Sequence, residues 1–225
     1  MIDDHLVIIF YVNKQKAVRK QGVILDENIV NEMVRRKIVS DTFRRLNSVK
    51  KEKLYLGGLL LFGKYGYDGL SVDKFCVHTR ISKGSFFQYF PSKAHLLEFI
   101  LLLFDKRLMM FIQQIKQGDP KILAKDRIGG LILALTSRGR LDVTEKIFYH
   151  FASNALYHSA VTVEGINIPR HLNNYVNDII KRGIETGEVR GDYSPTVTGA
   201  IVATALNAVL THYFLRNIQP DESTV

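Results

Sequence analysis

The residues best suited to chemistry lie between positions 82 and 93, where short polar and cationic side chains occur without a single acid. A helix that begins after Ser82 would point four residues outward: Lys83, Gly84, Ser85 and Gln88. Small or cationic side chains of this kind read base edges in the major groove of DNA, which is wide enough to admit one helix. Gly84 would let the backbone approach closely. The spacing therefore predicts a helix that reads DNA bases.

A base-reading helix also needs contacts that hold it on the phosphate backbone. Amide groups at helix starts suit that purpose, as do the side chains of Tyr89 and Lys93, which end and follow the predicted helix. Both groups of residues fall within one short segment.

Caps and apolar spacing indicate how this helix would be positioned. Ser71 is a good N-cap for a preceding short helix over 72–78, and Ser82 for the base-reading helix over 83–89. The two helices and the turn between them form a helix-turn-helix whose apolar side chains face inward. The residues expected inside are Val72, Phe75, Cys76, Ile81, Phe86 and Phe90.

The rest of the chain also has helical patterns, and the fold class predicted is all-α. Gly57 and Gly58 lie inside the first of these helices, where each costs about 1 kcal/mol relative to alanine, so another helix is expected to pass close to them. We expect helices at 50–65, 91–117, 120–137, 142–159, 169–187 and 195–217, with a loop at 161–169.

Residues 1–32 have weaker signals. Leu6 to Val12 is compatible with a short strand, and Asp26 with the N-cap of a helix running towards Ser40. The basic stretch from Arg35 to Lys53 has two interpretations: an arm that reaches phosphates or a minor groove, and an unstructured leader read from an early start codon.

The positive charge of the chain is concentrated. Residues 33–93 hold thirteen basic and four acidic residues, a net charge of +9 that equals the charge of the whole chain. A basic excess confined to one segment is typical of a module that neutralises phosphates, although a solvated basic face would give the same count.

Residues 59–72 and 81–93 resemble the DNA-binding domain of the TetR family of transcriptional regulators, through a glycine-aromatic turn, a capped second helix and the junction from Tyr89 to Lys93. The resemblance covers about residues 49–107. It implies that Ser71, Tyr89 and Lys93 contact phosphates. It also implies that Lys83, Ser85 and Gln88 face bases.

The resemblance further implies a three-helix DNA-binding head and a helical-bundle body that binds ligand and dimerises. The domains expected are an N-terminal extension at 1–47 that is basic towards its end, the head at 48–108 and the body at 109–225. The function implied is that of a homodimeric repressor, bound to a palindromic operator in duplex DNA and released by a small-molecule effector.

Five positions depart from the family pattern. Glycines 57 and 58 stand where two alanines are common, and Arg80 replaces a turn glycine, so it must tolerate or avoid a left-handed backbone. Phe87 stands where a phosphate-binding tyrosine is frequent, and His95 where a capping-box glutamate is common.

In the body, the helices at 171–187 and 195–217 resemble the dimerising pair of the family. Small residues on the last helix would let it meet its two-fold mate closely: Gly199, Ala200, Ala203, Thr204 and Ala208. A second group places polar tips on an apolar helix and is the candidate ligand site, with ordinary core or surface packing as the alternative. Its members are Tyr149, His150, Asn154, Tyr157 and His158.

Several function classes are excluded or disfavoured. The single cysteine, Cys76, rules out a disulfide framework, favours a reducing cytoplasm and is interpreted as core. No metal-ligand spacing, phosphate-binding loop or catalytic set is recognisable, so we expect no enzyme activity, no metal and no cofactor. No apolar run is long enough to span a membrane.

Two other functions remain open. One is an architectural or activating DNA-binding protein that senses nothing, and the other is a small-molecule-binding helical protein whose DNA-binding head is vestigial. Indifference of operator binding to metabolites would favour the first, and negligible, salt-insensitive DNA affinity the second.

Overall fold

The structure is a computed structural model that describes residues 25, 27–116, 123–136, 145, 148–149, 151–152, 168–192 and 194–216. Every element within these ranges is a helix, as the sequence predicts. The helices are α2 (Glu27–Arg35), α3 (Asp41–Arg44), α4 (Ser48–Gly69), α5 (Val72–Thr79), α6 (Lys83–Tyr89), α7 (Lys93–Lys116), α8 (Ala124–Thr136), α10 (Ile168–Glu185) and α11 (Pro195–Arg216). The strand considered at 6–12 and the loop at 161–167 lie outside the described residues.

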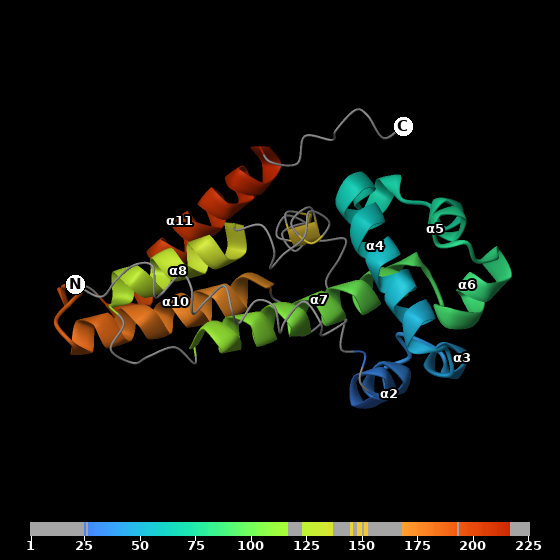
Figure 1. Cartoon of the computed structure of the whole chain (residues 1–225), viewed down its shortest axis with the longest axis horizontal. Coiled ribbons are helices and arrows are strands. Elements are labelled where there is room, and N and C mark those ends of the chain that lie inside the picture. Colours follow the sequence, from blue (N-terminus) through green and yellow to red (C-terminus); the bar gives the residue numbers. More distant parts are fainter. Residues whose placement is uncertain are drawn as a thin grey trace.

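The helices gather at two ends of the molecule. Figure 1 shows α2 to α6 at one end and α8, α10 and α11 at the other, with α7 running between them. We call the first group the head and the second the body. Because α7 runs from the head to the body, its packing determines how the head is positioned on the body.

The helix-turn-helix has the local structure that its sequence predicts. Ser71 caps α5 and Ser82 caps α6, each accepting a hydrogen bond from the amide three residues on. The helix α4 is kinked at Gly66, where φ is +68°. Its first part therefore ends at the helix end that the sequence predicts. Arg80 adopts the left-handed conformation (φ 54°, ψ 49°) that the family usually gives to glycine.

The paired glycines of α4 mark two close approaches. A Cβ built on Gly57 would lie 2.6 Å from Thr79 Cγ2 of α5, and one built on Gly58 would lie 2.5 Å from Ile100 Cδ1 of α7. The predicted reason for glycine at these positions is confirmed, because two helices cross α4 on neighbouring faces.

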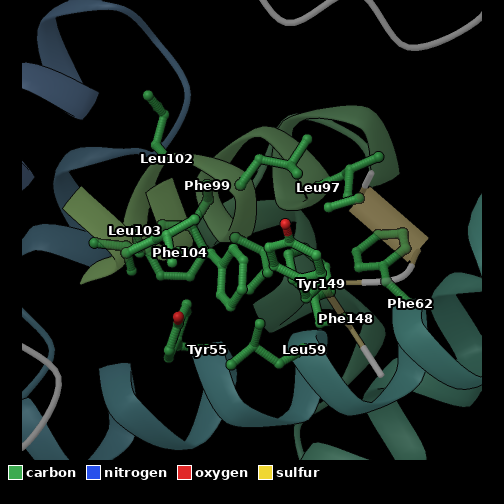
Figure 2. Packing of buried hydrophobic residues seen from close by; sticks show 14 of the residues in the cluster. Tyr55, Leu59, Phe62, Leu97, Phe99, Leu102, Leu103, Phe104, Phe148 and Tyr149 are labelled. Atoms are coloured by element: carbon green, nitrogen blue, oxygen red, sulfur yellow. The ribbon is translucent and has the colours of Figure 1, made fainter. Parts of the chain in front are cut away.

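One apolar core joins head and body. Figure 2 shows Tyr55, Leu59 and Phe62 of α4 facing side chains of α7 and the helical residues Phe148 and Tyr149. The Phe62 ring stacks on the Phe151 ring with centroids 6.0 Å apart. A side chain from the segment that follows α8 therefore packs directly on α4, the helix that precedes the helix-turn-helix.

The N-terminal segment differs most from the sequence-based expectation. Residues 27–46 fold into α2 and α3 and bury Val30, Met33 and Phe43 in the core of the head. The helix expected from Asp26 towards Ser40 stops at Arg35, and Lys37 follows it with φ +58°. The second half of the expected extension at 1–47 therefore supplies side chains to the core of the head, and no structural boundary falls at residue 47. No periodic pattern in the sequence indicates these core positions.

The described body helices begin and end near their predicted positions, with one correction. The helix expected at 142–159 lies largely outside the described residues. The helix expected from Pro120 begins at Ala124, whose amide donates to Glu188 Oε2 at 2.6 Å. A carboxylate from the α10–α11 connection thus occupies the positive end of α8. Gly187, at φ +78°, follows the end of α10 as predicted.

The small residues of α11 divide between two faces. A Cβ on Gly199 would lie 1.8 Å from Asn177 Oδ1 of α10, and Ala203 is fully buried. These two residues therefore pack inside the subunit and not against a two-fold mate, whereas Ala200, Thr204 and Ala208 are exposed. Among the described residues, no helix is long and apolar enough to cross a membrane.

Candidate nucleic-acid interface

The predicted base-reading helix, α6, is held by hydrogen bonds at both of its ends. At the start, Ser82 Oγ accepts from the Ser85 amide at 3.0 Å. At the end, the amide of Ser40 donates to the Tyr89 carbonyl at 3.0 Å, and the Ser40 hydroxyl donates to the Gln88 carbonyl. With Phe86 fully buried beneath it, the helix is fixed on three sides.

The outer face of α6 carries the residues expected there. Lys83, Gly84 and Gln88 are exposed, and Ser85 is half-buried with its hydroxyl 2.9 Å from that of Ser82. Among the described residues, the nearest atom to a Cβ built on Gly84 would be Ser82 Oγ at 3.8 Å. Nothing in the described part of the chain therefore requires glycine at this position, whereas close approach of another molecule would.

The Lys83 ammonium is paired before any ligand arrives. Its Nζ lies 3.0 Å from Asp73 Oδ1 and 3.2 Å from Asp73 Oδ2, across the turn between α5 and α6. Both side chains are largely exposed, so this ion pair is weak and water competes for it. A phosphate or a guanine edge can take the place of the carboxylate.

The three residues expected to contact phosphates differ in exposure. Ser71 is exposed at the start of α5. Lys93 is half-buried, and its Nζ donates to the Tyr67 carbonyl at 2.7 Å. Tyr89 differs most: its side chain is only 5% exposed, and its hydroxyl accepts from Lys50 Nζ at 3.0 Å. Tyr89 thus presents little surface of its own, and Lys50 supplies the cation at the end of α6.

Three residues of this surface were not assigned a role from the sequence. Ser40 lies 48 positions before its partner Gln88, and so no local pattern connects them. Asp73 and Lys50 belong to ordinary helix surfaces in the sequence, and their partners come from another helix. The aromatic residue Phe87 is 52% exposed on α6, where the family often has tyrosine.

Burial alters two titrating groups of the head. Burial raises the pKa of the Cys76 thiol, Asp73 raises it further and Lys83 lowers it. This agrees with Cys76 as a core residue. Burial lowers the pKa of Lys51, and the negative charge of Glu27 opposes that effect.

Only one member of the candidate ligand site falls within the described residues. Tyr149 is buried, and its hydroxyl donates to Asn207 Oδ1 of α11 at 2.8 Å. His150, Asn154, Tyr157 and His158 lie outside the described residues. The ligand site therefore stays a prediction.

The fold and this surface are those of a helix-turn-helix head joined to a helical body. Residues 57–100 match the family of bacterial regulatory proteins described as the tetR family. This match confirms the resemblance that the sequence indicates for the segment.

The individual proteins to which this chain is similar are also described as transcriptional regulators. An uncharacterised HTH-type transcriptional regulator of Bacillus subtilis (strain 168), YuxN, is 39% identical over 72 residues, which span 31% of this chain and 25% of that protein. A TetR family transcriptional regulator from Chloroflexus aurantiacus J-10-FL has a similar structure (TM-score 0.62, 20% identity, 82% of each chain covered). So does the transcriptional regulator FadR from Bacillus subtilis in complex with stearoyl-CoA (TM-score 0.57, 18% identity, 76% of this chain and 90% of that chain). These structures extend the similarity of fold from the head to the body.

Proposed function

We propose that the protein is a sequence-specific transcriptional regulator that binds a palindromic operator as a homodimer and represses until a small-molecule effector binds its body. The observation that carries the proposal is the arrangement of α6. Both of its ends are held, its inner side is buried, and its outer face presents Lys83, Gly84 and Gln88 without an acid on the helix.

The surface of α11 supports the homodimer. Four large apolar side chains stand exposed along it at spacings of four and eight residues: Val197, Ile201, Val209 and Tyr213. An apolar stripe of this kind marks an interaction site. A second copy related by a two-fold axis would cover it, with α10 and α11 of both subunits forming a four-helix contact.

The core between head and body supports coupling to an effector. Phe104 of α7 packs on Phe148 with centroids 5.1 Å apart, and Phe62 of α4 stacks on Phe151. An effector that shifts residues 148–152 would move the head and change the spacing of the two heads. Coupling between such sites is typically about 1–3 kcal/mol. The stearoyl-CoA bound to the similar structure from Bacillus subtilis supports effector binding by a body of this fold.

Selection of bound sequences from a random DNA library tests the proposal. We expect enrichment of a palindrome whose half-site centres lie about 34–36 Å apart, or a multiple of that spacing. Lys83→Ala should then lower the ratio of operator to random-DNA affinity. Lys93→Ala should weaken both alike and flatten the dependence of log affinity on log salt by about one unit.

Lys125→Ala is the matched control, because it removes one exposed lysine from α8, a body helix outside the proposed dimer contact. The proposal is wrong in its DNA part if no sequence is enriched or if Lys83→Ala leaves the ratio unchanged. It is wrong in its effector part if a broad metabolite collection leaves operator affinity untouched, which would favour a DNA-binding protein that senses nothing.

A further inference from the structure

The short helix α3 is attached directly to the end of α6. Ser40 caps α3, accepting from the Phe43 amide at 3.1 Å, and the same residue donates to the Gln88 and Tyr89 carbonyls of α6. Ser40 therefore forms hydrogen bonds with backbone groups at both the start of α3 and the end of α6. Figure 1 shows α3 beside α6 at the end of the molecule remote from the body.

Aromatic packing makes this attachment rigid. Phe43 of α3 is fully buried, and its ring lies 5.4 Å from the Phe90 ring and 5.0 Å from the Phe99 ring, centroid to centroid. Aromatic contacts of this kind add to the burial of the side chain. The outer residues of α3 are thus held at a fixed distance from the base-reading residues of α6.

The C-terminal end of α3 is basic. Arg44 ends α3 and Arg45 follows as its C-cap, and both side chains are exposed. Arg44 pairs with Asp41 at 2.8 Å, with both side chains about half exposed, as Lys83 pairs with Asp73. Such exposed pairs are weak, and a phosphate competes with the carboxylate for the guanidinium.

Arg44 and Arg45 lie next to other basic residues of the predicted interface. Asn47 caps α4 two residues after Arg45, and Lys50 in the first turn of α4 reaches the Tyr89 hydroxyl at the end of α6. Residues 44–53 hold five basic residues and one acid. The cations of α3 and α4 therefore flank the end of the base-reading helix, where the DNA backbone would pass on leaving the groove.

We propose that Arg44 and Arg45 bind the DNA phosphate backbone beside each half-site, so that α2 and α3 form part of the DNA-binding head and widen its footprint. This inference rests on the proposed function. Arginine suits the role because its planar guanidinium donates two hydrogen bonds to one phosphate. The contacts carry no base information, and so they strengthen operator and random DNA alike.

The test is a salt titration of binding to fluorescent duplexes, one carrying the selected operator and one of random sequence. For B-DNA, the slope of log affinity against log salt changes by about 0.9 for each phosphate contact. We expect Arg44→Ala/Arg45→Ala to flatten the slope by up to about 1.8 on both duplexes. The ratio of operator to random affinity should stay at the wild-type value.

The control variant is Lys125→Ala/Arg190→Ala, which removes the same charge from two exposed residues of the body outside α10 and α11. Arg190 pairs with a nearby acid, Asp192, as Arg44 pairs with Asp41. Its slope should match that of the wild type. Circular dichroism verifies the fold of each variant, and Arg45→Ala alone, which keeps the Arg44–Asp41 pair, replaces the double variant if that one does not fold.

The outcomes separate the two proposals. A wild-type protein with no salt-dependent DNA binding would overturn the proposed function and this inference together. If the wild type binds and Lys93→Ala flattens the slope, but the arginine variant keeps the wild-type slope, only this inference is overturned. The same holds if the arginine variant and the body control flatten the slope equally, because net charge alone would then explain the effect.

Discussion

Lys83, a residue of the proposed DNA interface, is held by an ion pair in the free protein. Its ammonium rests on Asp73 in the free protein, and both side chains are exposed. If Lys83 binds DNA as proposed, it would exchange the carboxylate for a phosphate or a base edge. The Asp73 carboxylate holds the lysine in place in the free protein, but it would also leave a negative charge close to the DNA phosphates.

Asp73→Asn should raise the affinity for random DNA by up to about fivefold, the factor that corresponds to a surface ion pair. The measurement is fluorescence anisotropy at low salt. Asp192→Asn is the control, because Asp192 forms an exposed pair with Arg190 in the body. Equal affinities of the Asp73→Asn variant and the wild type would show that the pair does not restrain Lys83.

Cys76 should react slowly with alkylating reagents in the native protein. Its pKa is raised by burial, so the reactive thiolate is depleted at neutral pH and accumulates only above the usual range of a thiol. Because the folded state holds this proton more tightly than the unfolded chain, the related contribution to stability is present at neutral pH and is lost as the pH rises through the raised pKa. Alkylation rates across pH, for native and urea-unfolded protein, check this. Equal rates in the two states at neutral pH would contradict it.

At the scale of elements, the close approach of α4 and α5 depends on Gly57. A Cβ there would meet the γ-methyl of Thr79, whose hydroxyl is bonded to the Phe75 carbonyl and cannot turn away freely. Gly57→Val should lower the free energy of unfolding by about 1–3 kcal/mol, the usual cost of overpacking.

Urea denaturation measures this change. Gly129→Val is the control, because no atom of the described residues outside its own helix lies within 4 Å of a Cβ built on Gly129, which is also inside a helix. That variant should differ little from the wild type. If both variants lost the same stability, helix propensity and not the contact with α5 would be responsible.

The attachment of α3 to α6 makes a second prediction about elements. Ser40→Ala removes an N-cap and the hydrogen bond to the Gln88 carbonyl, so it should lower the free energy of unfolding by about 1–3 kcal/mol. Ser71→Ala removes a cap alone, that of α5, and should cost about 1 kcal/mol. Denaturant titrations compare the two, and a smaller loss for Ser40→Ala would show that the link to α6 contributes nothing.

At the scale of the whole molecule, the exposed stripe on α11 predicts a dimer. Ile201 is 65% exposed at its centre, and Ile201→Glu would place a charge where two subunits meet. We expect a dimer mass for the wild type and a monomer mass for the variant by analytical ultracentrifugation, with loss of binding to a palindrome. Val77→Glu on α5 alters a valine that is 79% exposed in the head and should leave the mass at that of the dimer. A monomeric wild type would contradict the prediction.

The sequence alone determined the local architecture of this protein. Ser71 and Ser82 were recognisable as caps, Gly66 and Gly187 as helix ends, and Gly57 and Gly58 as close approaches. Each of these signals depends on a residue type or on hydrogen bonds within three or four positions, and such interactions recur whatever the rest of the chain does.

Only the tertiary structure decided which of these elements meet. The fold of α2 and α3 onto the head, the double role of Ser40 and the burial of Tyr89 behind Lys50 depend on partners at least 39 positions apart. Likewise, α11 places Gly199 against its own subunit, although the sequence is compatible with Gly199 in a dimer seam, and it places Ile201 towards solvent. Contacts between distant residues follow from how apolar surfaces fit together in space, and no periodic pattern along the chain records that fit.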